Sequence, residues 1–192
     1  MEKPAHLVTV GHGTLEEQQF GSLVEDAGVG FVVDVRRAPG SRRHPAFGRV
    51  ELERWLPQRG VQYRWEPRLG GFRRPRPDSR NVALRNDAFR GYADYMTTAD
   101  FAAALGKVLA EATGRDLDAG VVSVMCAESV WWRCHRRLLA DAAMLRGGAE
   151  VVHLMHDGRM TAHRLTDGVR LGDDGVLVYD GGDGALPGMG RE

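Results

Sequence analysis

Five short β-rich segments alternate with helical segments over residues 7–155, and this order constrains the fold more than any other feature of the chain. Most of the β-rich segments are nearly continuous apolar runs, as in FVVDV and GVVSVM, which is typical of parallel strands buried on both faces. Parallel neighbours need a long crossover connection, and a helix commonly supplies it. The order therefore predicts an α/β fold with a Rossmann-like, doubly wound and mostly parallel five-stranded sheet.

Turn and capping residues set the expected limits of these elements. We expect strands at residues 7–10, 31–35, 61–65, 120–125 and 150–155, and helices at 15–27, 51–59, 87–96, 98–112 and 134–146. Thr14 and Glu17 have the spacing of a capping box at the start of the first helix, and Thr98 is the expected N-cap of the fourth. The segment 68–85 contains two Gly, two Pro and six Arg, which indicates a long loop.

The texture of the chain changes after residue 155, where Gly, Asp and isolated Val or Leu dominate. This pattern predicts a hairpin around residues 162–179 and disorder in the last dozen residues. A length of 192 residues fits one domain. We therefore assign an α/β domain to residues 1–160 and treat 161–192 as its hairpin and tail.

Composition argues against several classes of protein. No stretch approaches about 18 consecutive apolar residues, so no membrane span is expected. The first ten residues, MEKPAHLVTV, contain no apolar signal core. Two cysteines do not make a disulfide framework. We expect a cytoplasmic protein with both thiols reduced; the sequence defines no oligomeric state.

The net charge is zero, but the charges are unevenly distributed. Residues 35–90 contain fifteen arginines, no lysine and five acids, a net charge of +10, and the rest of the chain carries −10. Such zoning can make one face of a neutral protein strongly positive. Arginine also suits bidentate contacts to phosphate. The segment predicts a phosphate-bearing partner, DNA or RNA included; solvated surface arginine is the alternative.

The unusual polar residues fall where the predicted strands end, and ligands of open parallel sheets bind beyond those ends. They are Gly11 and His12 on the first strand's end, Asp34 and Arg36 on the second, Glu66, Gly70 and Gly71 after the third, Cys126 and Glu128 after the fourth, and His153 and His156 on the fifth. Because separate segments deliver these groups to one edge, we expect a shared site there.

The segment from Cys126 to Arg136 leads from the fourth strand into a helix. A helix N-terminus lowers the pKa of a nearby thiol and attracts anions. Cys126 could act as a nucleophile with His135 as its base, or Cys126, Cys134 and His135 could bind a metal. Alternatively, Glu128 is a general acid/base or nucleophile and Arg136 holds a phosphate. Both cysteines also fit a purely structural role as small buried side chains.

Two earlier segments allow both a functional and a structural interpretation. The turn Gly11-His12-Gly13 could cradle a phosphate, with His12 as ligand or base, or could be a capped turn with an incidental histidine. Asp34 lies in an apolar strand and needs a partner there. Arg36 is two residues further on, so a structural Asp34–Arg36 pair competes with a catalytic role.

The tryptophans and the late histidines carry weaker signals. Trp131 and Trp132 could stack a base or sugar, or pack the loop that contains them. The histidines at 153, 156 and 163 do not have a recognisable metal-ligand spacing.

Six segments resemble the bacterial and archaeal family named domain of unknown function 488. They are TVGHGT (9–14), VVDVRRAPGS (32–41), LGGFR (69–73), AFRGYADYM (88–96), CAESVWWRCHRRLLAD (126–141) and VVHL (151–154). The resemblance spans residues 8–156 and implies a Rossmann-like α/β fold with a shared polar pocket, without implying an activity. Gly13 stands where the family usually has Ser or Asn.

We favour an enzyme of hydrolase type that cleaves an N-glycosidic or phosphoester bond in a nucleotide or nucleic acid. Its expected catalytic residues are Glu128, Asp34, His12 and Cys126. Its expected substrate- and phosphate-binding residues are Arg36, Arg136, Gly11, Gly70, Gly71, Trp131, Trp132 and His135.

Two other functions stay open. One is a metal or redox protein built on Cys126, Cys134 and His135, which could bind a divalent metal. No cofactor is predicted for the hydrolase. The other is a non-catalytic module that binds nucleic acid through the arginine-rich segment 35–90, whose binding should weaken steeply with salt.

Overall fold

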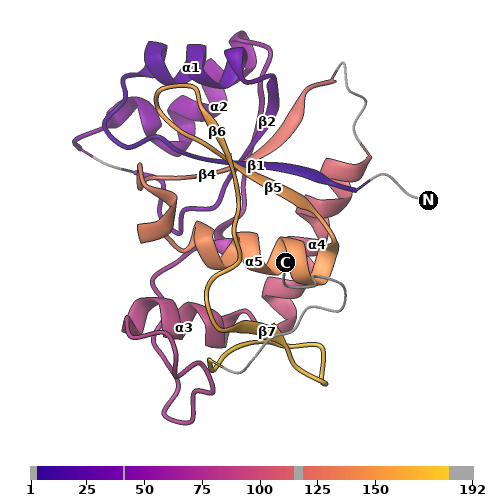
Figure 1. The fold of residues 1–192 in the computed structure, drawn as a ribbon. Helices are drawn as coiled ribbons and strands as arrows, with labels where there is room; N and C mark the ends of the chain where they lie inside the picture. The colour runs from indigo at the N-terminus through magenta and orange to yellow at the C-terminus, as the bar shows by residue number, and fades with distance from the viewer. Residues whose placement is uncertain (1–3, 41, 115–118, 182–192) are drawn as a thin grey trace.

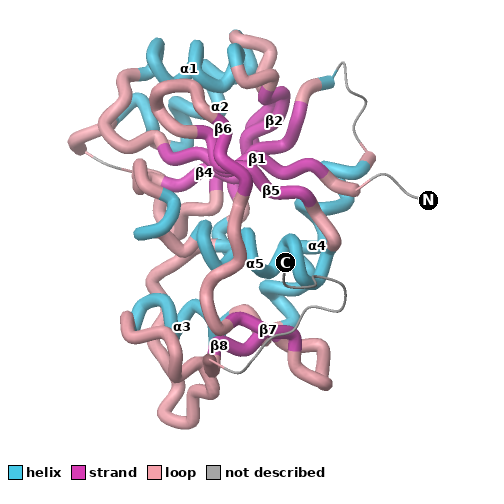
Figure 2. The backbone as a smooth tube through the Cα atoms, in the orientation of Figure 1, coloured by secondary structure: helices cyan, strands magenta, loops and turns pink. Residues whose placement is uncertain are grey.

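One six-stranded sheet lies at the centre of the computed structural model, which describes residues 4–40, 42–114 and 119–181 (Figures 1 and 2). Its strands are β1 (His6–Gly11), β2 (Val29–Asp34), β3 (Gln62–Trp65), β4 (Val121–Cys126), β5 (Glu150–Leu154) and β6 (Met160–Ala162). The order is β3-β2-β4-β1-β5-β6; the first five are parallel, and β6 is antiparallel to β5.

The α/β class and the mostly parallel sheet are confirmed. The predicted number of five strands is wrong for the sheet, because the short and exposed β6 adds a sixth at its edge. The Rossmann-like winding is not confirmed: the dinucleotide-binding fold has strand order 3-2-1-4-5-6, whereas here β4 lies between β2 and β1. That insertion places the carboxyl end of β4 beside those of β1 and β2.

Helices cover both faces of the sheet (Figure 1). They are α1 (Glu17–Asp26), α2 (Arg49–Gln58), α3 (Asp87–Tyr95), α4 (Ala99–Thr113) and α5 (Arg136–Gly147). The core divides accordingly: Val32 packs with side chains of α1 and α2, and Val33 with side chains of α4 and α5. This division follows from the period of two along a strand, which points successive side chains to opposite faces.

The ends of the helices confirm one of the two capping predictions and correct the other. Thr98 caps α4 by accepting a hydrogen bond from the backbone of Phe101, as predicted. The predicted capping box of Thr14 and Glu17 is wrong. Glu16 is the N-cap of α1, and its partner is Gln19, because the helix begins two residues later than its sequence pattern indicated.

A separate antiparallel hairpin of β7 (Val169–Leu171) and β8 (Leu177–Tyr179) follows the sheet and confirms the hairpin expected within 162–179. Figure 1 shows it beyond α5, next to α3. The tail predicted to be disordered lies almost entirely in 182–192, outside the described residues. Among the described residues, no helix is long and apolar enough to cross a membrane.

The predicted loop 68–85 is confirmed as irregular beyond its first two residues, which end a short helical turn at Pro67–Leu69. It is nevertheless tied to α3. The buried carboxylate of Asp94 accepts hydrogen bonds from the backbone of Arg76 and from the side chains of Ser79 and Asn81. Fixed in this way, the loop brings its first residues against the carboxyl edge of the sheet.

Candidate functional site

A cavity of about 420 Å³ lies beyond the carboxyl ends of β2 and β4. That volume suits a small organic ligand. The residues that line it are Arg36, Arg37, Ala38, Gly71, Phe72, Ala88, Phe89, Cys126, Ala127, Glu128, Arg133, Cys134 and His135. They come from the end of β2, the arginine-rich loop 68–85, the start of α3 and the connection between β4 and α5. The cavity therefore lies at the edge of the sheet where the sequence predicts a site.

Charged groups without partners lie at this cavity. Glu128 and Arg133 are both exposed, and neither side chain has a hydrogen bond or ion pair within the part of the chain that the structure describes. Arg37 is also exposed and donates one hydrogen bond, to the carbonyl oxygen of Phe72 (3.0 Å). One free carboxylate and two available guanidinium groups can therefore meet a ligand.

Arg36 lines the cavity, but its guanidinium is committed elsewhere. It donates to both carboxylate oxygens of Asp34, Nε to Oδ1 at 2.8 Å and Nη2 to Oδ2 at 2.6 Å. It also donates to the carbonyl oxygen of Phe47 and to Nε2 of His12. Asp34 is fully buried and receives a further hydrogen bond from Tyr63 (2.9 Å). This geometry is that of the structural Asp34–Arg36 pair, which the sequence offers as the alternative to a catalytic role.

His12 is buried beneath this pair and stacks on Phe47, with ring centroids 4.3 Å apart. Its Nδ1 donates to the carbonyl oxygen of Gly13, and its Nε2 accepts from Arg36 (3.2 Å). Burial, together with the charge of Arg36, lowers the pKa of His12 to about 4. A neutral ring with both nitrogens engaged positions Arg36, and it does not reach the cavity lining.

The two thiols form the floor of the cavity. Cys126 at the end of β4 and Cys134 before α5 are both buried, with 3.0 Å between the two Sγ atoms. Burial, with the hydrogen bond to Cys134, raises the pKa of Cys126 well above its usual range. Burial alone would also raise the pKa of Cys134, but the hydrogen bond from Cys126 and the charges of His135 and Arg136 outweigh it and hold that pKa well below its usual range. Of the two thiols, Cys134 is therefore the one that loses its proton more readily.

Arg136, the first residue of α5, turns its side chain inward beneath the thiols and is only 1% exposed. Its guanidinium donates to the carbonyl oxygens of Glu128 and Ser129 and to Oγ1 of Thr9, and its Nε has no partner. No carboxylate contacts it within residues 4–40, 42–114 and 119–181. It does not line the cavity, so a ligand phosphate in the cavity would not meet it directly.

A chain of hydrogen bonds leads from Thr9 to the buried carboxylate of Asp141. Thr9 Oγ1 lies 2.6 Å from His153 Nδ1, His153 Nε2 lies 2.9 Å from His163 Nδ1, and His163 Nε2 lies 2.9 Å from Asp141 Oδ1. Tyr179 of β8 donates to the other carboxylate oxygen of Asp141 (2.9 Å). Burial, with His163 and Arg136 nearby, lowers the pKa of His153 to about 3. The chain thus connects the C-terminal hairpin to the arginine beneath the thiols.

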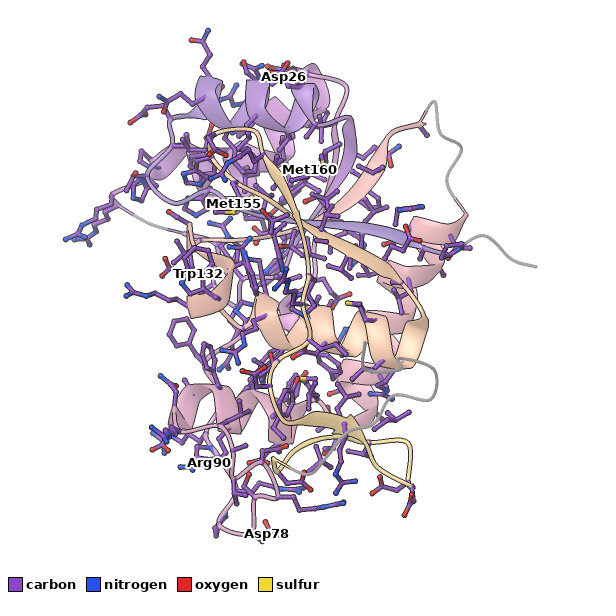
Figure 3. The ribbon with its side chains drawn as sticks, viewed as in Figure 1. Asp26, Asp78, Arg90, Trp132, Met155 and Met160 are labelled. Carbon is purple, nitrogen blue, oxygen red and sulfur yellow. The ribbon has the colours of Figure 1, made fainter. Side chains whose placement is uncertain are left out.

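The aromatic residues of the site are not the expected pair. Trp131 stacks on His153 with ring centroids 3.9 Å apart and packs the loop. Trp132 is 47% exposed but does not line the cavity; Figure 3 labels it at one side of the molecule. Phe72, which is 88% exposed and has a positive φ of 57°, and Phe89 of α3 line the cavity instead.

The glycines at the edge allow close packing. A Cβ at Gly11 would lie 1.8 Å from the carbonyl oxygen of Glu128, and a Cβ at Gly71 would lie 2.9 Å from His135 Nδ1. Gly11 therefore lets the β4–α5 connection close over β1, and Gly71 lets the arginine-rich loop approach α5. Both glycines therefore shape the site through the close approaches that they allow.

Five of the residues predicted for the site line the cavity together: Arg36, Gly71, Cys126, Glu128 and His135. Cys134, predicted as a metal-ligand alternative, joins them. The other predicted residues do not line it, and they are Asp34, His12, Arg136, Gly11, Gly70, Trp131 and Trp132. Sequence reasoning missed Arg37, Arg133, Phe72 and Phe89. Arg37 follows the predicted Arg36, and Arg133 lies between Trp132 and Cys134. The two phenylalanines belong to segments that resemble the family, LGGFR and AFRGYADYM.

Among the described residues, no group of three or more His, Cys, Asp or Glu side chains is arranged to hold a metal ion. A divalent metal bound by Cys126, Cys134 and His135 stays a prediction from the sequence.

The fold and the site define a class: an α/β protein with a pocket at the carboxyl edge of a mostly parallel sheet, lined by arginines, a free glutamate and two thiols. The family model described as domain of unknown function DUF488 matches residues 17–143. The chain belongs to this family. No curated protein and no solved structure matched the chain.

Proposed function

We propose that the protein is a hydrolase that binds a nucleotide in the cavity and cleaves its N-glycosidic or phosphoester bond. One observation carries the proposal. The free carboxylate of Glu128 lies in the same cavity as the free guanidinium of Arg133 and two phenylalanine rings. A nucleotide offers an anion, a flat ring and a bond between them that an acid or base can cleave.

The roles follow from what each side chain has available. Arg133 and Arg37 have donors left for phosphate oxygens, and arginine binds these in a bidentate manner. Phe72 and Phe89 supply ring faces on which a base can stack, an interaction typically worth about 1–3 kcal/mol. Glu128 is the general acid/base, because it is the carboxylate that lines the cavity without a partner in the described chain.

The distribution of charge favours a free nucleotide over a nucleic acid. Of the fifteen arginines in 35–90, nine form ion pairs with carboxylates of the described residues, four of them with acids outside the segment, at positions 25, 34, 111 and 174. The excess positive charge seen in the sequence is therefore partly neutralised in the fold. Arg37 and Arg133, which line the cavity, form no ion pair within the described residues.

The test is a panel of nucleoside monophosphates, nucleosides and short single-stranded oligonucleotides, scored first by thermal shift and then by product analysis. Glu128→Gln should lower turnover of the nucleotide that is cleaved by ~10²–10⁴-fold and leave its binding intact. Arg133→Ala should weaken binding of the monophosphate and leave the weaker binding of the nucleoside unchanged.

Glu17→Gln and Arg74→Ala are matched controls, since neither residue lines the cavity, and both should behave like the wild type. The proposal is wrong if no nucleotide in the panel binds, or if Glu128→Gln turns over at the wild-type rate.

A further inference from the structure

Arg136 and the two thiols are a feature that nucleotide hydrolysis leaves without a use. A buried cation is costly unless a counter-charge or a full set of acceptors compensates it. Arg136 has three oxygen acceptors, all of them uncharged, and its Nε is buried without a partner. The groups of negative charge that act on Arg136 are the sulfurs of Cys126 and Cys134, and its charge acts on both of them.

Cys134 also receives the donors that a thiolate requires. The backbone N–H of Arg136 points to its Sγ at 3.5 Å, His135 Nδ1 lies 3.4 Å away, and the Cys126 thiol lies 3.0 Å away. Cys126 is held in place from the other side, because its sulfur accepts a hydrogen bond from the backbone N–H of Glu128 (3.2 Å). The two sulfurs need to approach by only about 1 Å to reach the bond length of a disulfide.

The pair is also open to a reagent. Both cysteines belong to the lining of the cavity, so a small molecule that enters it comes next to the pair. Arg37 and Arg133 stand in the same lining, which favours a reagent that carries carboxylates.

We propose that Cys134 and Cys126 are a thiol–disulfide exchange site, in which Cys134 attacks a small anionic organic disulfide and Cys126 resolves the product. The inference goes beyond the proposed hydrolase and does not depend on it, because its readout is the state of two sulfur atoms and not turnover of a nucleotide.

The reaction balances in two steps. The Cys134 thiolate attacks one sulfur of the small disulfide, forms a mixed disulfide and releases the other half as a thiolate, which takes the proton of Cys126. Cys126, now a thiolate, attacks the sulfur of Cys134 and expels the second half of the reagent. The protein sulfurs lose two electrons and form the Cys126–Cys134 disulfide, and the reagent is reduced to one thiol and one thiolate.

The experiment uses the native full-length protein and oxidised glutathione as the anionic disulfide, followed by intact mass and by titration of free thiols. The wild type should lose both thiols and two hydrogen atoms, without retaining glutathione. Cys126→Ser should stop at one glutathione bound to Cys134. Cys134→Ser should react at least about tenfold more slowly, since the thiolate and not the thiol is the nucleophile.

Charge selectivity provides a second arm. Arg133→Ala should slow the reaction with oxidised glutathione and leave the reaction with uncharged hydroxyethyl disulfide unchanged; Arg74→Ala, outside the cavity, should change neither. Equal effects of Arg133→Ala on both reagents would overturn the preference for an anionic disulfide.

A readout without substitutions covers the case in which a serine variant does not fold. Brief alkylation of the wild type with iodoacetamide, followed by peptide mapping, should label Cys134 before Cys126. The proposal is overturned if the wild type keeps two free thiols in oxidised glutathione, if Cys126 is labelled first, or if Cys134→Ser reacts as fast as Cys126→Ser.

Discussion

Arg36 and Arg136 lie at the same edge of the sheet, but they differ in burial and in the charge of the groups that accept their hydrogen bonds. Arg36 is held by the two carboxylate oxygens of Asp34, so that its charge is neutralised within its own segment. Arg136 is more deeply buried, and the oxygens that it contacts are carbonyls and a hydroxyl. One arginine completes a structural pair, whereas the other leaves its charge to act on the thiols of the cavity floor.

The histidines attached to the two arginines extend the comparison. His12 accepts a hydrogen bond from Arg36 and ends that network at a backbone carbonyl. His153 binds Thr9, which accepts from Arg136, and passes the chain on to Asp141. In the second network the carboxylate lies three hydrogen bonds away from Thr9, so it orients the groups without neutralising the arginine directly. We infer that the first network fixes the frame of the cavity and the second tunes its chemistry.

The largest expected effect is on the structural pair. Arg36→Met leaves Asp34 fully buried without its cation, and breaking a buried pair in this way typically costs about 3–5 kcal/mol. Chemical denaturation at neutral pH should show a loss of this size. Arg49→Met is the control, since its ion pair with Glu53 is about half exposed and should contribute much less to stability than the buried pair. Losses of equal size in the two variants would show that Asp34 does not depend on Arg36.

A second prediction concerns pH and the histidine of the same network. His12 has a pKa of about 4 in the folded protein and of about 6.5 when it is exposed in the unfolded chain. Between these values the unfolded chain binds a proton that the folded chain does not, so stability decreases as the pH falls through this window and levels off below it. At about 1.4 kcal/mol per pH unit, the His12 contribution is about 3 kcal/mol.

His12→Gln isolates that contribution, because glutamine does not titrate and all other groups cancel in the difference between the variant and the wild type. The difference in unfolding free energy should change by about 3 kcal/mol from pH 7 to pH 4, with the wild type losing more. A difference that stays constant over this range would mean that His12 is not buried as a neutral ring.

The sequence predicted the first network better than the second. Asp34 and Arg36 are two residues apart, and an acid in an apolar strand demands a partner, so a local rule suffices to pair them. The parallel sheet and its helices follow from apolar runs and caps in the same way. The edge at which polar residues gather follows from the direction of parallel strands.

The second network depends on strand order, which no local pattern contains. Thr9 and His153 meet because β1 and β5 are neighbours, and Arg136 reaches Thr9 because β4 lies on the other side of β1. The inward turn of Arg136 was missed because an arginine at a helix N-terminus ordinarily suggests a bound anion. The strand β6 was missed because three exposed residues carry no periodicity.

The smallest expected effect on stability is the most informative about the comparison. Arg136→Met removes a buried cation that has no carboxylate partner in the described chain, and the proton that Cys134 then takes up removes the matching negative charge. What stays unmet is a set of oxygen acceptors, at a typical cost of about 1–3 kcal/mol, below the loss for Arg36→Met.

The same change, Arg136→Met, should raise the pKa of Cys134 toward its usual range and slow its alkylation at neutral pH. Arg137, the next residue along α5, donates a hydrogen bond to Thr166 instead. The control Arg137→Met should therefore leave the rate of alkylation of Cys134 unchanged. If Arg136→Met destabilises the fold as much as Arg36→Met, the two arginines play the same structural role. If Arg136→Met leaves the alkylation of Cys134 unaffected, the thiols do not depend on Arg136.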